Sequence, residues 1–175
     1  MRTSLLMLLW LAAVAPVAHA ADWLSWRKVG DASLTWGPFT VYTSQLSTPD
    51  GRYHGPEQDQ ALIITYKRDI DREQLVEATR DQWRAQGILE REPQSAAWLH
   101  MLQSLWPDVT SGSQLTFVLK DKLGQFWYRA SGAEQSFTPL GPSQSAAFSI
   151  NFLAIWLDPH TQYSELRQQL IGGEK

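Results

Sequence analysis

The order of strand-like and helix-like segments constrains the fold of this chain more than any other feature. Strand-like segments occur mainly in neighbouring pairs joined by short turns, and segments with helical periodicity lie between and after them. This arrangement is typical of the α+β class, so the sequence predicts an antiparallel sheet with helices packed on one face. The expected strands are 33–44, 61–67, 114–120, 126–129 and 135–137, and the expected helices are 71–86, 95–106, 143–157 and a short last one capped by Ser164.

The helix expected at 71–86 carries the clearest local signals. Asp71 is followed three residues later by Gln74, which matches a capping box, and Gly87 fits the C-terminal end. Apolar and small residues recur at i, i+3 and i+4 spacing, which predicts one inward face. The residues expected on that face are Leu75, Ala78, Thr79, Gln82 and Trp83.

The first twenty residues have the three parts of a secretory signal peptide. Arg2 gives a positive start, 5–14 is an apolar run, and Ala18-His19-Ala20 is a small-x-small cleavage site. The alternative is a retained membrane anchor, but a spanning helix needs about 20 apolar residues. We therefore expect cleavage after Ala20, a single domain over 21–175 with no stable membrane insertion, and a periplasmic or secreted location.

The composition of the expected mature chain excludes several classes of function. Removing 20 of the 175 residues leaves 155, and it removes one charged residue, so 14 basic and 18 acidic side chains remain, a formal net charge of −4. A mildly acidic chain without a basic cluster is unsuited to nucleic acid. The chain has no cysteine, so packing rather than disulfides must hold the fold.

Eight tryptophans remain after the expected cleavage. They predict an aromatic core, with an aromatic-lined ligand pocket as the alternative. Trp23 and Trp26, close to the expected mature N-terminus, have two interpretations. They form an exposed patch that binds a partner, or they fold back onto the sheet.

The sequence carries no recognisable catalytic or metal-binding motif. It lacks a phosphate-binding glycine loop and a G-x-S-x-G elbow, and the histidines at 54, 100 and 160 are scattered. Ser25-Trp26-Arg27-Lys28 matches S-x-x-K without the motifs that accompany it in penicillin-recognising enzymes, and Asp158-Pro159-His160 has the pattern of a helix end. We therefore expect no catalytic residue, no metal and no cofactor.

Four segments, taken in order, resemble the bacterial chalcone isomerase-like proteins, exported relatives of plant chalcone isomerases and plant fatty-acid-binding proteins. The run RDID…LVEAT and the closing F-x-A-I-W-L-x-P are the most specific. The resemblance implies an open-faced β-sandwich, a large antiparallel sheet with a layer of helices against it. The segments are VGDASLTWGPFTVYTSQL at 29–46, ALIITYKRDIDREQLVEAT at 61–79, WPDVTSGSQLTFVL at 106–119 and FLAIWLDPHTQYSELRQQLIG at 152–172.

The same resemblance implies a cleft, but this chain departs from the catalytic pattern at almost every position. The isomerases hold an oxyanion with an arginine near the start of the first long strand, and 30–33 contains none; Lys28 is the nearest cation. Their other cleft groups are a strand threonine, a tyrosine, a lysine and an asparagine on one helix face, and a late-helix threonine. By alignment these positions hold Tyr42, Leu75, Ala78 and Gln82, and Ile155 at or near the last.

Three functional hypotheses follow from this substitution pattern. The first is a non-catalytic protein that binds a fatty acid or another small amphipathic molecule in an apolar cleft, with the same cleft filled by side chains as its alternative. The second is a structural or partner-binding role, for which the sequence identifies no partner. The third is an enzyme, either a weak isomerase or one with relocated chemistry. The aligned positions lack the electrostatic stabilisation that isomerase chemistry needs.

Overall fold

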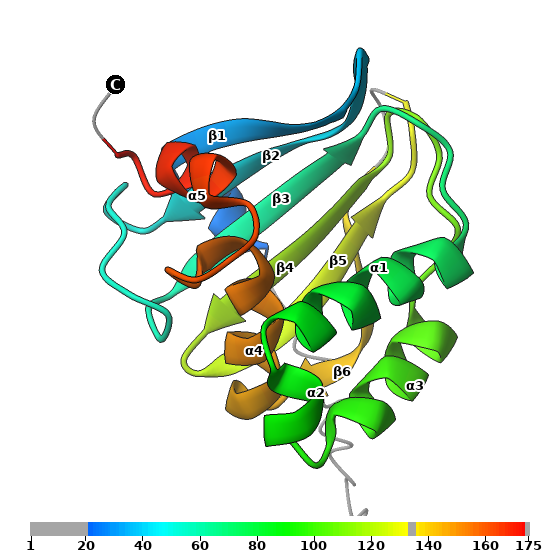
Figure 1. Cartoon of the computed structure of the whole chain (residues 1–175). Helices are drawn as coiled ribbons and strands as arrows, with labels where there is room; N and C mark the ends of the chain where they lie inside the picture. The colour runs from blue at the N-terminus through cyan, green and yellow to red at the C-terminus, as the bar shows by residue number, and fades with distance from the viewer. Residues whose placement is uncertain (1–20, 133–135, 174–175) are drawn as a thin grey trace, which may run out of the picture.

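A six-stranded antiparallel sheet forms the centre of the protein, and its strands follow one another in chain order (Figure 1). The computed structural model describes residues 21–132 and 136–173. The predicted signal peptide therefore lies outside the described residues. The strands are β1 (Arg27–Trp36), β2 (Phe39–Thr48), β3 (Gln60–Tyr66), β4 (Gln114–Lys120), β5 (Leu123–Arg129) and β6 (Thr138–Gln144).

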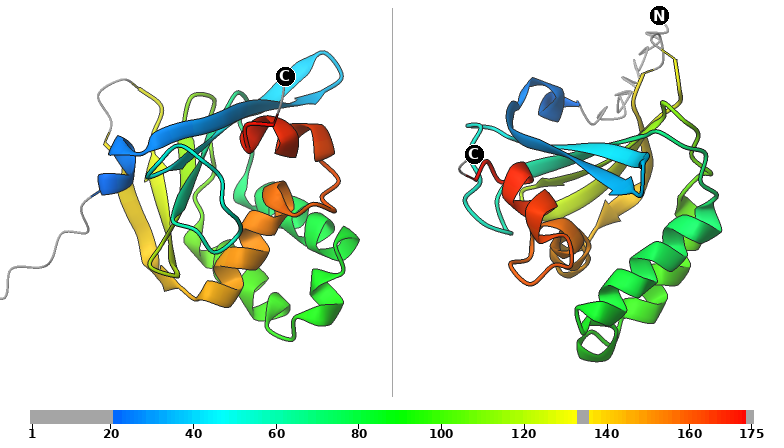
Figure 2. Two further views of the ribbon diagram at one scale, coloured as in Figure 1. Left: turned by 90° about the vertical axis from the view of Figure 1, so that its left-hand side faces the viewer. Right: turned by 45° about the horizontal axis from the view of Figure 1, so that its top comes forward.

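The α-helices all lie on one face of the sheet, whereas the short 3-10 helix η1 (Asp22–Ser25) lies on the other (Figure 2). This arrangement is an α+β open-faced sandwich, as the sequence predicts. No helix in the described part of the chain is both long and apolar enough to span a membrane. The helices are α1 (Arg72–Ala85), α2 (Ile88–Arg91) and α3 (Ser95–Leu105) between β3 and β4, and α4 (Ala146–Leu157) and α5 (Ser164–Leu170) after β6.

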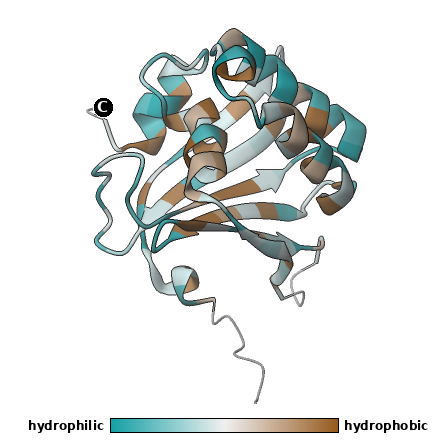
Figure 3. Cartoon of the chain, turned by 90° about the horizontal axis from the view of Figure 1, so that it is seen from below, coloured by the Kyte–Doolittle hydropathy of each residue, from teal (hydrophilic) through white to brown (hydrophobic). Residues whose placement is uncertain are grey.

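The main core lies between the sheet and the helices. Apolar residues alternate with more polar ones along the strands, so one face of the sheet meets the helices (Figure 3). Phe117 and Phe126 project from neighbouring strands and contact Phe148 and Phe152 of α4, with ring centroids 5.0 to 6.0 Å apart. This aromatic contact area is the predicted aromatic core.

A second, smaller apolar cluster covers part of the opposite face. Trp23 of η1 is 2% exposed and packs against Trp127 (centroids 6.0 Å apart) and Phe137 (4.9 Å). Trp26 is half-buried against the same cluster. These tryptophans therefore fold back onto the sheet, and the interpretation as an exposed patch is wrong.

The helix signals at 71–86 are confirmed. The Asp71 carboxylate accepts a hydrogen bond from the backbone N–H of Gln74 (2.8 Å), and the Gln74 side chain accepts one from the backbone N–H of Asp71 (3.3 Å). Gly87 follows the helix with a φ of 72°, the left-handed conformation that favours glycine. Val76, which the predicted inner face omits, is buried, whereas Ala78 is exposed.

Several boundaries differ from the sequence predictions. The helix expected at 143–157 begins at Ala146, because residues 143–144 pair in β6 and Ser145 is the N-cap. The single strand expected at 33–44 is a hairpin, because Gly37-Pro38 is the turn between β1 and β2 rather than a bend within one strand. The strand expected at 135–137 begins at Thr138 and runs through two prolines, which an edge strand tolerates. Ser164 opens α5 but makes no capping hydrogen bond, since Tyr163 occupies the N-cap position.

One close contact fixes α5 to the sheet, and one isolated bridge closes the segment that carries α1 to α3. A Cβ on Gly30 of β1 would lie 2.0 Å from the carbonyl oxygen of Gln169, so only glycine lets α5 lie this close. Ile70 and Val109 form an isolated antiparallel bridge, and the N···O distances of its two backbone hydrogen bonds are 3.0 and 2.9 Å. This bridge joins the beginning and the end of the segment that carries α1 to α3.

Candidate functional site

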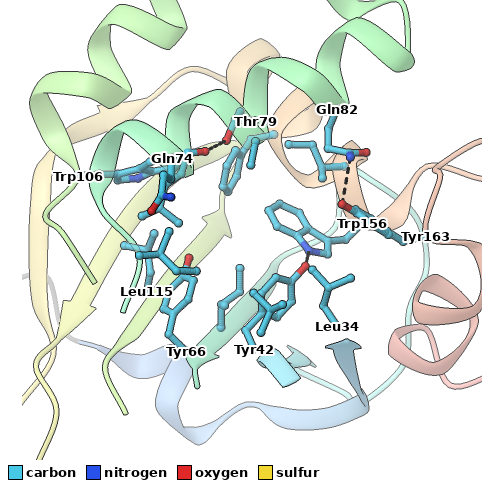
Figure 4. A pocket seen from close by; sticks show the side chains of 17 residues that line it. Leu34, Tyr42, Tyr66, Gln74, Thr79, Gln82, Trp106, Leu115, Trp156 and Tyr163 are labelled. Carbon is cyan, nitrogen blue, oxygen red and sulfur yellow. Dashed lines mark hydrogen bonds between the residues drawn. The ribbon is translucent and has the colours of Figure 1, made fainter. Parts of the chain in front are cut away.

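An apolar cavity of about 150 Å³ lies between the sheet, α1 and the C-terminal half of α4 (Figure 4). Its position follows from the fold: β2 and β3 supply one wall, and α1 crosses over them as the opposite wall. The lining residues are Leu34, Val41, Tyr42, Ile64, Tyr66, Ile70, Gln74, Leu75, Ala78, Thr79, Gln82, Trp106, Leu115, Phe152, Ile155, Trp156 and Tyr163.

The cavity has a buried end and a partly exposed rim. The buried wall combines aliphatic and aromatic side chains of the sheet and α4, among them Ile64, Tyr66 and Phe152. The rim is formed by half-buried or exposed residues of the β1–β2 hairpin, α1 and the two loops beside them. The rim residues are Leu34, Val41, Ile70, Gln74, Leu75, Ala78, Gln82 and Tyr163.

The structure brings all five predicted cleft residues together on this one cavity. Tyr42 lies on β2 and is buried, and Ile155 lies on α4 with 3% of its surface exposed. Leu75, Ala78 and Gln82 lie on successive turns of α1, on the side of the helix that lines the cavity. The five positions taken from the resemblance thus line a single cavity.

Sequence reasoning missed most of the lining, including four residues with polar atoms that face or border the cavity. Tyr66 shares the face of β3 that carries Leu62 and Ile64, so strand alternation was a usable signal. Trp156 follows Ile155 in a helix that is apolar on all sides, and such a helix has no stripe that marks an inner face. Trp106 and Tyr163 lie in connections after α3 and before α5, where no periodicity exists.

The polar groups of the buried wall are the hydroxyls of Tyr42, Tyr66 and Thr79 and the indole N–H groups of Trp106 and Trp156. The Tyr42 hydroxyl accepts a hydrogen bond from Nε1 of Trp156 (2.8 Å), and the Tyr42 and Tyr66 rings are 6.2 Å apart, edge to face. Burial raises the pKa of Tyr42, and burial together with the neighbouring Tyr42 raises the pKa of Tyr66. Both phenols therefore stay neutral around pH 7 and offer O–H groups rather than negative charge.

A hydrogen bond closes one side of the rim. Nε2 of Gln82 on α1 donates to the Tyr163 hydroxyl at 3.0 Å, joining two residues far apart in the chain (Figure 4). Partial burial raises the pKa of the Tyr163 phenol, and the bond from Gln82 opposes that rise. The contact holds α1 to the loop before α5, which limits access to the cavity on this side.

No Lys, Arg, His, Asp or Glu side chain lines the cavity among residues 21–132 and 136–173. Lys28, the cation nearest to the family's arginine position, instead bonds Asp31 at 2.9 Å, and both side chains are more than half exposed. The described residues also contain no cluster of three or more His, Cys, Asp or Glu that could hold a metal ion. The lining can donate hydrogen bonds but offers no cation to an oxyanion.

The chain is similar over most of its length to a protein of Haemophilus influenzae. The chain is 29% identical over 161 residues to an uncharacterized protein of Haemophilus influenzae. The aligned region covers 92% of this chain and 72% of the relative. No family model matches the chain. The similarity extends across both the sheet and the helices that enclose the cavity.

Proposed function

We propose that this chain is an exported chalcone isomerase-like protein that binds a small amphipathic molecule without transforming it. The observation that carries the proposal is the cavity of about 150 Å³, which has an apolar wall and a few hydroxyl and amide groups. Such a composition suits an apolar ligand with a polar end. The open-faced sandwich and the position of the five aligned residues support the same assignment.

We infer that the site is not catalytic, because its described lining carries no positive charge. Cyclisation of a chalcone needs an ionised phenol held by cationic or hydrogen-bonding groups, and electrostatic stabilisation supplies most of such rate enhancement. The described lining residues include no cation. We expect a chalcone solution to lose its visible absorbance no faster with the protein than in buffer. A faster and saturable loss of absorbance would support the isomerase hypothesis and contradict this proposal.

The test of binding is native mass spectrometry of the full protein purified from its own compartment. The expected result is a small molecule that co-purifies and dissociates on denaturation. Its amount should fall when Ala78 on the rim is replaced by Phe, and it should persist when the exposed Ala85 of the same helix is replaced by Phe. A protein that is consistently ligand-free, and that displaces no lipid or aromatic dye, would contradict the proposal.

The proposed location has its own test. Cell fractionation should place the protein in the periplasm or the medium, and mass spectrometry of its N-terminal peptide should begin at Ala21. Ala21 packs against the second apolar cluster, so cleavage there leaves that cluster complete. A cytoplasmic protein that retains its first twenty residues would contradict export.

A second candidate, a partner-binding role, is favoured by the tip of the β1–β2 hairpin. Trp36 and Phe39 face each other across the turn with 74% and 56% of their surfaces exposed, and the Arg68 guanidinium lies 5.2 Å from the Phe39 ring centroid. Exposed aromatic pairs of this kind mark interaction sites. A photoreactive residue at position 36 should crosslink a discrete neighbour in intact cells. The same residue at the exposed Leu123 is the control, and equal labelling at both positions would argue against a specific surface.

A further inference from the structure

The Tyr66 hydroxyl is a buried polar group that faces the cavity. Tyr66 is only 4% exposed, and its side chain points from β3 into the space that α1 covers (Figure 4). Within the described residues, no hydrogen bond is made to this hydroxyl, in contrast to Tyr42, which accepts from Trp156. A hydroxyl that faces an apolar cavity without a protein partner favours a ligand that completes its hydrogen bond. Nε1 of Trp106, a fully buried donor of the same lining that also has no partner, favours an acceptor on the ligand as well.

The charge of the lining constrains the ligand. Every polar side chain on the described wall is neutral: tyrosine, glutamine, threonine or tryptophan. A carboxylate or an ammonium group in such a site loses its hydration and gains no opposite charge, so its charged form is strongly disfavoured. An uncharged molecule avoids this cost, so the lining discriminates against a free fatty acid or any other anion.

The size of the cavity sets a second limit. Its volume of about 150 Å³ equals that of an engineered apolar cavity that accepts benzene. Sites for drug-sized ligands run from about 300 to 1,000 Å³. Aromatic rings of Tyr42, Trp106, Phe152 and Trp156 form much of the wall, and they pack well against another ring in edge-to-face or offset geometry.

We propose that the cavity binds an uncharged molecule of about one aromatic ring that presents a hydrogen-bond acceptor to the Tyr66 hydroxyl. This inference rests on the proposed binding function and narrows its ligand class. The Tyr66 hydroxyl favours a ligand with a hydrogen-bond acceptor, and the neutral wall disfavours a charged ligand. The volume of the cavity disfavours a ligand with a long alkyl chain. Gln82 and Tyr163 limit access at the rim through their hydrogen bond.

Three matched probes and palmitate test the proposal on the full mature protein. Acetophenone carries an acceptor, benzoate adds a negative charge to nearly the same shape, and cumene has the shape without an acceptor. Ligand-observed NMR titrations at pH 7 should give binding of acetophenone, at least roughly tenfold weaker binding of benzoate, and no saturable binding of palmitate. Benzoate or palmitate binding as tightly as acetophenone would overturn the proposal.

The variant Tyr66→Phe removes one oxygen and preserves the ring. It should weaken acetophenone by roughly three- to tenfold, the range of a single neutral hydrogen bond, and leave cumene unchanged. Tyr128→Phe, at a half-buried position outside the cavity, is the matched control and should change neither. Equal weakening of both probes by Tyr66→Phe would mean that shape rather than the hydroxyl selects the ligand, which contradicts the proposed role of Tyr66.

The outcomes separate this inference from the broader binding function. If palmitate binds and Ala78→Phe abolishes its binding, the ligand class is wrong and the binding function stands. If all four probes fail but native mass spectrometry finds a co-purifying molecule, the class is again wrong. If no probe binds and the purified protein is empty, both proposals fall. Ala85→Phe controls for the aromatic substitution itself, because Ala85 is exposed on α1 away from the cavity.

Discussion

At the scale of single residues, the two cavity tyrosines link the site to stability. Tyr42 and Tyr66 are 8% and 4% exposed, and burial raises the pKa of each phenol above its usual value. In the unfolded chain both phenols ionise with a pKa of about 10. Their neutral burial therefore stabilises the folded protein fully below pH 10, and this contribution is lost as the pH rises further, because only the unfolded state releases the protons.

The expected result is a fall in the free energy of unfolding between pH 9 and 11, of roughly 1 kcal/mol per tyrosine by pH 11. Urea unfolding measured across this range checks it. The double variant Tyr42→Phe and Tyr66→Phe should lose about 2 kcal/mol less than the unaltered protein over the same interval, with each protein referenced to its own value at pH 8. Identical pH dependence in the two proteins would contradict the argument.

The five cleft positions predicted from the sequence line one cavity, but most of the lining of that cavity did not follow from the sequence. Leu75, Ala78 and Gln82 share one helix face by spacing alone, and alignment to an isomerase cleft added Tyr42 and Ile155. Helical periodicity and order along the chain carry that information. The rest depends on how segments distant in sequence pack: the Gln82–Tyr163 hydrogen bond joins residues from different elements, and no local pattern encodes it.

At the scale of elements, α1 is the helix that covers the cavity on the side opposite the sheet. Its capping box satisfies two backbone N–H groups at the N-terminus, and Arg72 is held further by the Asp108 carboxylate, which accepts from its backbone N–H at 2.8 Å. Trp83 anchors the last turn through Nε1, which donates to the Asn151 carbonyl at 3.0 Å. Both ends of α1 are thus tied to other elements.

Replacing Asp71 with Ala removes one of the two hydrogen bonds of the capping box, the one from the Gln74 backbone N–H to the Asp71 carboxylate. We expect a loss of about 1 kcal/mol in the free energy of unfolding, measured by urea denaturation. Glu73→Ala, at an exposed position in the same first turn, should change it by less than about 0.5 kcal/mol. Equal effects of the two substitutions would show that local charge, rather than the cap, governs this end of the helix.

The element predictions succeeded where local chemistry decides and failed where pairing decides. Asp71 and Gln74 announce a helix start regardless of tertiary structure. Gly37-Pro38, in contrast, fits a bend or a hairpin turn equally well, and only the pairing of Trp36 with Phe39 resolves the choice. β6 has a composition that disfavours strands, and it forms because its backbone pairs with β5 at the sheet edge.

At the scale of the whole molecule, the sheet also carries an apolar patch on the face that the α-helices leave uncovered. The second cluster of Trp23, Trp127, Ala61 and Val118 covers part of the other face, and η1 supplies its lid. Without Trp23, this apolar surface would meet water. The N-terminal segment after the expected cleavage site is therefore a structural part of the domain.

Replacing Trp23 with Ala should lower the free energy of unfolding by about 3 kcal/mol, because a large side chain leaves a packed aromatic site. It should also increase the fluorescence of a hydrophobic dye in the folded protein. Leu24→Ala is the control, since Leu24 is 59% exposed in the same turn, and we expect a change within about 0.5 kcal/mol. A stable Trp23→Ala protein without added dye binding would assign the cluster no structural role.

The sequential order of the strands also has a consequence for folding kinetics. Four of the five strand pairings join neighbours in the chain through short connections, whereas β3 and β4 can pair only after the chain from Tyr66 to Gln114 has looped back. Closing that loop costs entropy before its contacts form, so this step should limit the refolding rate. Replacing Ile64 or Leu115, which pair across β3 and β4, with a smaller side chain should then slow refolding more than equally destabilising changes at the hairpin turns. Stopped-flow fluorescence can measure the difference in refolding rate.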